Sequence, residues 1–259
     1  MTEGDAGMRS VRTALRILEC VADHQPAGVG ELSRMLGVPK SSVQRALRTL
    51  GAAGWIRPAP GEATRWVLTG RARRVGRLAG EENSIREAAM AAMERLRAET
   101  GETVHLMVPD GPRAVLIERL ETANPVRVVL PLGSSVPLHG SANGKAILAG
   151  LPARQAEALL DGELPRYTDH TIVSWAHFQA ELAGIRRRGY ATNHGEWRAD
   201  IAAAAAAITG TAGQPVASLS VSTPVSRMSP DLAGRYGALV AAAARQVSAA
   251  LADDRAGPV

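Results

Sequence analysis

Hydrophobic residues recur at the spacing of an α-helix in three segments near the start of the chain. The pattern predicts helices over residues 10–22, 31–36 and 40–53, because apolar side chains three and four positions apart share one helical face. Pro26 separates the first two helices, and Gly37 is placed to end the second. These three helices are close enough along the chain to form one small packed unit.

Two short strands are expected after the third helix. Residues 55–57 and 65–68 contain Trp, Ile and Val, and the segment between them, 58–64, contains Pro and Gly. Three helices followed by a two-stranded ribbon, within about 60 residues, have the outline of a winged helix-turn-helix domain.

The chain is expected to be helical again from residue 70 to residue 100. Residues 80–84 interrupt this stretch, and Ser84 with Glu87 forms a capping-box pattern that predicts a new helix start. We therefore expect a domain boundary near residue 80. The predicted parts are a winged helix-turn-helix domain at 1–69, a linker helix region at 70–83 and a second domain at 84–259.

The second domain has the pattern of an α+β fold. Strands are predicted at 103–108, 114–120, 126–130, 201–208 and 215–222, and helices at 142–149, 153–160, 174–188 and 230–251. Strands and helices do not alternate regularly. An antiparallel sheet flanked by helices is therefore expected rather than a doubly wound parallel sheet.

Composition agrees with two globular domains and divides the charge between them. The chain has 259 residues, of which 46% are hydrophobic and 21% are charged. The first 80 residues carry 13 Lys+Arg and 6 Asp+Glu, a net charge of +7, whereas the remainder carries 17 and 19, a net charge of −2. A basic domain joined to a nearly neutral one indicates a polyanion-binding module with a second function attached.

No targeting, membrane or disulfide signal is found in the sequence. No apolar stretch reaches the roughly 18 residues that cross a bilayer, and the opening MTEGDAGMRS lacks the apolar core of a signal peptide. Cys20 is the only cysteine, which excludes an intramolecular disulfide and a multi-cysteine zinc site. We expect a cytoplasmic protein that does not associate with membranes.

The predicted helix 40–53 has a polar face without acidic residues. Arg can bind guanine edges through two hydrogen bonds, Gln can bind adenine, and Ser or Lys can bind phosphates. A solvated face is the alternative, but the helix-turn-helix spacing and the regional charge favour double-stranded DNA as the partner. The residues expected to contact DNA are Pro39, Lys40, Ser41, Ser42, Gln44, Arg45 and Arg48, with Arg57 and Arg65 on the ribbon. The arginines at 71–77 are either phosphate contacts or a solvated face.

Five segments resemble the IclR family of bacterial transcriptional regulators. ELSRMLGVPKSSVQRALRTLGAAGWI resembles its DNA-binding domain, and GEATRWVLTGRARRVG resembles its wing and linker helix. PLHGSANGKAILAGLP resembles its effector-loop segment, and GYATNHGEW and PVASLSVSTPVSRMS match two further segments. The resemblance implies an N-terminal winged helix-turn-helix domain joined to a C-terminal α+β effector-binding domain. It also implies a homodimer or a homotetramer that binds a pseudopalindromic operator. We expect a repressor whose effector is a small organic acid.

The resemblance also places the effector site. Small residues at 140–144 allow close backbone approach, and the start of the predicted helix 142–149 favours an anion; an ordinary helix N-cap is the alternative. Ser220 and Ser222 share one strand face, which is either part of the pocket or exposed. The family's pocket maps onto Ser141, Ala142, Asn143, Gly144, Asn193, Ala203, Ser220 and Ser222.

Two positions depart from the family pattern. Many members have an acid where Asn193 stands and a cysteine where Ala203 stands, so this pocket loses a charge and a thiol. These replacements favour an effector larger or more apolar than a two-carbon oxoacid, such as an aromatic acid. The alanines at 202–207 are equally well explained as core filling.

Catalysis, a metal and a cofactor are not expected. The histidines show neither HExxH nor HxH spacing. The segment from Gly140 to Lys145 is one residue shorter than a P-loop, and Ala146 replaces the hydroxyl residue that would hold magnesium. The alternative to a ligand-responsive regulator is a small-molecule-binding protein or enzyme with an accessory basic domain.

Overall fold

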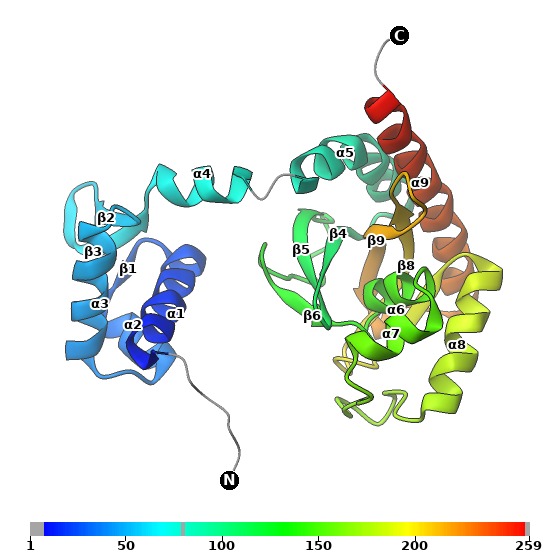
Figure 1. The fold of residues 1–259 in the computed structure, drawn as a ribbon, viewed down its shortest axis with the longest axis horizontal. Coiled ribbons are helices and arrows are strands. Elements are labelled where there is room, and N and C mark those ends of the chain that lie inside the picture. The colour runs from blue at the N-terminus through cyan, green and yellow to red at the C-terminus, as the bar shows by residue number, and fades with distance from the viewer. Residues whose placement is uncertain (1–7, 79–80, 257–259) are drawn as a thin grey trace. The chain divides into compact units, whose positions relative to one another are not determined.

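The computed structural model describes residues 8–78 and 81–256 (Figure 1). The chain divides into two compact units, Met1–Gly80 and Glu81–Val259. Helix α4 (Gly70–Leu78) belongs to the first unit and α5 (Glu81–Thr100) begins the second. The expected helix start at Ser84 is therefore wrong, because the helix already begins at Glu81. Acidic residue types are favoured in the first turn of a helix, and two of them precede Ser84.

Three helices pack around one core in the first unit. Their bounds are α1 (Arg9–His24), α2 (Val29–Leu36) and α3 (Lys40–Ala52). Leu32, Val43 and Leu47 are buried on the predicted apolar faces of α2 and α3, whereas α1 buries Ile17 and leaves Val11 and Leu15 of its expected apolar face exposed. Gly37 ends α2 in the left-handed conformation, with a φ of 64° that glycine adopts without strain. The helical part of the winged helix-turn-helix prediction is confirmed.

The wing is a longer hairpin than expected. Strands β2 (Ile56–Ala59) and β3 (Glu62–Leu68) pair antiparallel, so the turn between them is much shorter than the predicted connection at 58–64. Pro58 is paired with Trp66 within the hairpin. β2 is an edge strand, where prolines are found, and the pairing shifts register directly after Pro58. A two-residue strand that was not expected, β1 (Ala27–Gly28), pairs with the other side of β3.

The second unit is built on an antiparallel sheet of six strands, in the order β6-β5-β4-β9-β8-β7. The strands are β4 (Thr103–Asp110), β5 (Arg113–Leu120), β6 (Ser135–Pro137), β7 (Ala191–His194), β8 (Ile201–Thr209) and β9 (Pro215–Pro224). The helices are α5, α6 (Ala142–Ala149), α7 (Ala153–Leu159), α8 (Trp175–Arg188) and α9 (Pro230–Ala256), with a 3-10 turn at Val225–Arg227. The predicted fold class, α+β with an antiparallel sheet flanked by helices, is confirmed.

Helices cover both faces of this sheet (Figure 1). α5 and α9 pack on one face around Ala202, Ala204 and Ala206, whereas α6 and α8 pack on the other face beside Ala203 and Ala205. Successive strand residues point to opposite faces, so the alanine run of β8 contributes to both cores. Its small side chains let helices approach the sheet closely. The core-filling interpretation of this run is therefore confirmed for the buried alanines.

One predicted strand, at 126–130, is absent from the described residues. Val128 and Leu130 are buried and Val129 is exposed, so buried and exposed side chains do alternate here as they would in a strand. The segment is an extended loop that covers the sheet on one side, and the Leu130 carbonyl accepts a hydrogen bond from the Arg119 side chain. The short strands β6 and β7 were not expected, because three or four residues give little periodicity.

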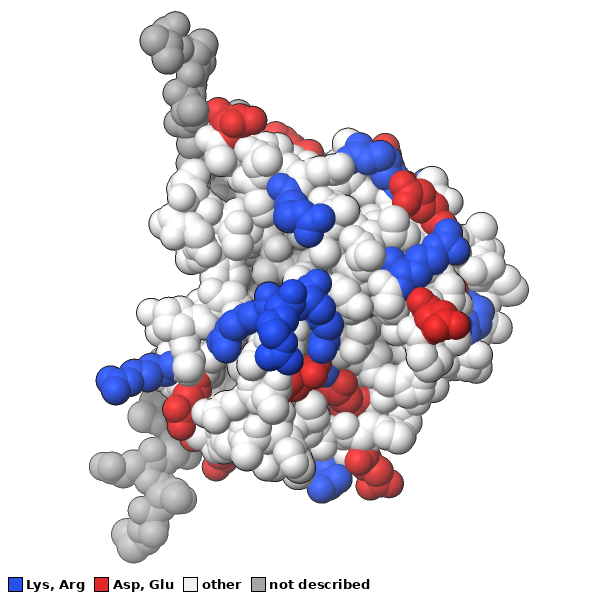
Figure 2. All heavy atoms as spheres, turned by 90° about the vertical axis from the view of Figure 1, so that its right-hand side faces the viewer, with Lys and Arg blue, Asp and Glu red and all other residues white. Residues whose placement is uncertain are grey.

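One face of the molecule carries charges of both signs. The face drawn in Figure 2 shows basic and acidic side chains among a larger area that is neither, with one compact basic group near its centre. Among the described residues, no helix is long and apolar enough to cross a membrane. Within the same residues, no group of three or more His, Cys, Asp and Glu side chains is arranged to hold a metal ion.

Candidate functional site

The exposed face of α3 carries most of the predicted DNA-contacting residues. Pro39 occupies the N-cap and supplies no side-chain hydrogen bond, so amides of the first turn remain available to a phosphate. Ser42 is half-buried. The exposed side chains along this face are those of Lys40, Ser41, Gln44, Arg45 and Arg48. Val43, Leu47 and Leu50 are buried on the opposite side, which fixes the orientation of the polar face.

The two predicted arginines of the wing differ in their surroundings. Arg57 is exposed, and its Nη1 lies 3.4 Å from the carbonyl oxygen of the neighbouring Pro58. Arg65 instead donates to both carboxylate oxygens of Glu31, at 3.0 and 3.1 Å, and to the Pro26 carbonyl at 2.6 and 2.9 Å. Its guanidinium joins the wing to the start of α2. We therefore assign Arg65 a structural role and omit it from the proposed DNA contacts.

Arg71, the first of the linker arginines, also has a structural role. Its guanidinium lies 5.5 Å from the centre of the Trp55 ring, and its Nη1 donates to the Ala53 carbonyl at 2.7 Å. These contacts attach α4 to the end of α3. Arg74 in the same helix is exposed.

A narrow cavity of about 20 Å³ lies in the second unit, between the sheet and the start of α6. Six of the eight predicted pocket residues line it: Ser141, Ala142, Asn143, Asn193, Ala203 and Ser222. The other lining residues are His105, Met107, Val128, Leu130, Val136, Trp197 and Ile201. This volume holds roughly one water molecule. The cavity is mostly apolar, with polar groups contributed by α6, β4, β7 and β9.

Gly144 and Ser220, the two remaining predicted residues, lie outside this lining. A Cβ atom on Gly144 would lie 2.2 Å from the backbone of Leu138, so only glycine allows α6 to pack against that segment. Ser141 accepts a hydrogen bond from the Gly144 amide at 3.1 Å and is therefore the N-cap of α6. The N-cap interpretation is confirmed, and it coexists with a place for Ser141 in the cavity wall.

The two asparagines of the cavity are held in place by the protein itself. Asn143 donates to the Ser218 hydroxyl at 3.0 Å. Asn193 donates to the Gly140 carbonyl at 3.0 Å and accepts from the Glu196 amide at 2.9 Å. These bonds tie β7, β9 and the start of α6 together, so both side chains are preorganised.

His105, which is not among the predicted pocket residues, lies on β4 at the floor of the cavity. Its Nδ1 is 3.1 Å from the Ser222 hydroxyl, and its Nε2 has no hydrogen-bond partner. Burial, followed by the positive charge of Arg119, lowers the pKa of His105 to about 4. The ring is therefore neutral near pH 7. A single histidine in an apolar strand is an ordinary sequence feature, and only the pairing of β4 with β9 brings it within hydrogen-bond distance of Ser222.

A buried ion pair stands behind the cavity wall. Lys145 on α6 is 1% exposed and contacts both carboxylate oxygens of Glu196. Burial raises the pKa of Glu196, and the ammonium group of Lys145 opposes that shift. Thr168 and Thr171 donate to the backbone carbonyl of Glu196. These contacts hold the loop whose next residue, Trp197, lines the cavity. Neither member of the pair was predicted as functional.

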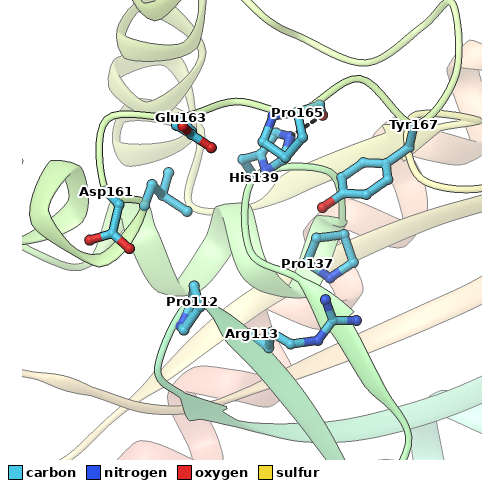
Figure 3. A pocket seen from close by; sticks show the side chains of 9 residues that line it. Pro112, Arg113, Pro137, His139, Asp161, Glu163, Pro165 and Tyr167 are labelled. Atoms are coloured by element: carbon cyan, nitrogen blue, oxygen red, sulfur yellow. Dashed lines mark hydrogen bonds between the residues drawn. The ribbon is translucent and has the colours of Figure 1, made fainter. Parts of the chain in front are cut away.

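A second pocket, of about 230 Å³, opens on the other side of the segment that precedes α6 (Figure 3). Its walls include Arg113 and Tyr167 on one side and Asp161 and Glu163 on the other. The Nε2 of His139 lies 2.9 Å from the Pro165 carbonyl, and burial lowers the pKa of this histidine. None of the predicted site residues lines this pocket.

Comparisons with known proteins cover nearly the whole chain. Residues 79–249 match the family described as "Bacterial transcriptional regulator IclR C-terminal", and residues 10–60 match the "IclR helix-turn-helix domain". The chain is 32% identical over 247 residues to the transcriptional repressor IclR of Escherichia coli K12, which covers 94% of this chain and 90% of the relative.

Two solved structures are similar over the same length. The crystal structure of the Thermotoga maritima IclR has a TM-score of 0.75 at 27% identity and covers 95% of this chain and 100% of its own. An IclR homologue from Microbacterium hydrocarbonoxydans, complexed with 4-hydroxybenzoate, has a TM-score of 0.75 at 22% identity and covers 96% of this chain and 100% of its own. At that identity the second likeness concerns the fold.

Proposed function

Because this chain belongs to the IclR family of bacterial transcriptional regulators, it is a DNA-binding regulator, and we propose that an aromatic acid controls its binding to an operator. Relatives that cover most of the chain are named transcriptional repressors. Repression is therefore the mode of regulation that these relatives support.

The DNA-binding half of the proposal rests on the exposed face of α3. Arg45 and Gln44 are exposed next to one another, on a helix whose other side is fully packed. Such side chains can read guanine and adenine edges in the major groove, and the exposed Lys40 and Ser41 can bind phosphates. A homodimer or a dimer of dimers would present two such helices to a pseudopalindromic operator, with half-sites one helical turn or a multiple apart.

Gel-shift binding to the DNA upstream of the protein's own gene tests this half. A specific complex should survive competitor DNA and weaken steeply as salt increases, because phosphate contacts release counterions. Binding that competitor DNA removes completely would contradict operator recognition.

The effector half rests on the lining of the cavity. Trp197, Leu130 and Met107 supply apolar walls, while Ala203 leaves space and Asn193 carries no charge. A ring with one polar end is complementary to this combination. The complex of an IclR homologue with 4-hydroxybenzoate gives a suitable probe for an aromatic acid.

The size of the cavity supports a link between binding and conformation. A benzene ring is far larger than a cavity of about 20 Å³. An aromatic acid therefore has to displace part of the wall, in which the loop segment holding Val128 and Leu130 lacks strand partners. An effector regulates DNA binding only if its affinity differs between two arrangements of the protein, and we infer that it favours the arrangement in which this part of the wall is displaced.

Calorimetric titration of the full-length protein with 4-hydroxybenzoate, benzoate and glyoxylate tests the effector class. Binding of the aromatic acids, with weak or no binding of glyoxylate, is expected. Tight binding of glyoxylate with no binding of either aromatic acid would overturn the proposal. A parallel thermal-shift measurement should show stabilisation by the same acids, since a ligand that binds the folded state stabilises it by mass action.

A further inference from the structure

Two buried polar atoms in the second unit have no hydrogen-bond partner: Nε2 of His105 and Oγ of Ser220. Among the described residues, these are the buried side-chain nitrogen and oxygen atoms that lack a hydrogen-bond partner. A buried donor or acceptor without a partner destabilises the folded protein, so most such groups in proteins are bonded to protein, water or ligand.

The sheet register brings these two residues together. His105 on β4 is directly opposite Ser220 on β9, and both are fully buried. Residues paired in this way have Cβ atoms about 4.5–5.5 Å apart and point to the same face of the sheet. On that face lie α6 and the cavity. His105 and Ser222 line the cavity, and Ser220 lies beside them, opposite His105 and just outside the lining.

The remaining nitrogen of His105 is already engaged. Its Nδ1 lies 3.1 Å from the Ser222 hydroxyl, which is free to donate its proton to that nitrogen. In this tautomer Nε2 carries the ring proton, so His105 and Ser220 both offer a donor to the same region. An acceptor-only group, such as a carboxylate, is complementary to two adjacent donors.

We propose that His105 binds the effector directly, with its Nε2–H and the Ser220 hydroxyl donating hydrogen bonds to the carboxylate of an organic acid. The proposal rests on the regulatory function assigned above, and it adds a ligand-binding residue to the cavity. The acid group then lies on the floor of the sheet, and the apolar part of the ligand extends toward Leu130 and Trp197. Arg119 on β5 is opposite His105 on the other side of β4. Its guanidinium forms an ion pair with Glu121 at 2.9 Å, so we do not assign it to the ligand.

Calorimetric titration of the full-length protein with benzoate and 4-hydroxybenzoate tests this assignment. The Ser220→Ala variant removes one donor, and His105→Leu removes the other. Each should raise the Kd for both acids about tenfold or more, because a hydrogen bond to a charged group is lost. His105→Gln keeps an amide donor near the position of Nε2, so it should retain more affinity than His105→Leu. His177→Gln, at an exposed histidine, is the matched control and should bind like the wild type.

Melting temperature separates a ligand-binding role from a structural one. Ser220 makes no hydrogen bond through its hydroxyl, so Ser220→Ala should keep or raise the melting temperature of the ligand-free protein while it loses affinity. Should His105→Leu fail to fold because Ser222 loses its partner, Ser220→Ala and His105→Gln decide the question.

The outcomes distinguish this inference from the proposed function. If the wild type binds both acids and the variants bind them equally well, the role of His105 is wrong while the effector class stands. Weaker binding of 4-hydroxybenzoate alone would place His105 at the ring hydroxyl and overturn the carboxylate assignment. If the wild type binds neither acid, the aromatic effector is wrong and the assignment of His105 falls with it.

Discussion

The ammonium nitrogen of Lys145 lies 2.6 and 2.7 Å from the two carboxylate oxygens of Glu196. Glu181 provides a second carboxylate, 3.8 Å from the same nitrogen. Removal of one partner from a buried pair leaves an uncompensated charge, which costs about 3–5 kcal/mol. The pair therefore fastens α6 to the loop that carries Trp197.

We expect Lys145→Met and Glu196→Gln each to lower the free energy of unfolding by several kcal/mol in urea denaturation at pH 7. The double variant should recover much of the loss, because neither charge remains. Lys145→Met should also be less harmful at lower pH, since burial raises the pKa of Glu196 and a proton then neutralises it. Additive losses in the double variant would contradict a direct pairing.

The low pKa of His105 predicts a specific acid sensitivity. This pKa is about 4 in the folded protein against an ordinary value of 6.5, so the unfolded chain binds the proton more readily. Stability is therefore unaffected above about pH 6.5 and falls as the pH drops toward 4. Between pH 7 and 4.5 the loss from this residue should be about 2–3 kcal/mol. His105→Gln should lack that part of the pH dependence, and an identical acid loss in both proteins would show that folding does not lower the pKa of His105.

Gly144 should be the least replaceable glycine of the cavity region. In Gly144→Ala the new Cβ would lie 2.2 Å from the Leu138 backbone, and neither segment is a flexible side chain that could move aside. We expect a loss of several degrees in melting temperature. Gly234→Ala in α9 is the control, because nothing lies within 4 Å of its Cβ and alanine favours a helix by about 1 kcal/mol. Equal effects of the two variants would contradict the close packing of α6.

Arg45 should determine operator sequence preference. Arg45→Ala is expected to weaken specific binding by about 1–3 kcal/mol and to relax the preference at one base pair of each half-site. Gln44→Ala should act similarly at a different base pair. Arg187→Ala removes an exposed cation from the other unit and should leave the preference unchanged. Gel shifts on a set of single-base operator variants measure these effects, and an unchanged preference in Arg45→Ala would argue against α3 as the recognition helix.

The two arginines of the wing, Arg57 and Arg65, should differ in their effects on stability and on DNA binding. Arg65→Ala removes the bonds to Glu31 and Pro26, so we expect a lower melting temperature of the DNA-binding domain with little change in the salt dependence of binding. Arg57→Ala should leave stability unchanged and reduce the slope of log K against log salt by about 0.9, as expected for one lost phosphate contact. If instead Arg65→Ala reduced the salt dependence and Arg57→Ala lowered the melting temperature, Arg65 would be the DNA contact and Arg57 the structural residue.

The helices of both units and most of the strands were predictable because their signals are local. The buried face of α3, the glycine that ends α2 and the serine that caps α6 each depend on residues within a turn or two. The segment at 126–130 shows the limit of such signals. One-sided burial produces the same alternation in a loop as in a strand, and only a partner strand distinguishes the two.

The sequence alone predicts two domains, the polar face of α3 and, through the family resemblance, the pocket loop. Which polar groups are already bonded depends on the tertiary structure. Arg65 meets Glu31 across 34 residues, Lys145 meets Glu196 across 51, and His105 meets Ser222 across 117. Such pairings depend on chain segments brought together by sheet register and helix packing. No local pattern specifies them, so the unpartnered atoms of His105 and Ser220 became visible only in the folded chain.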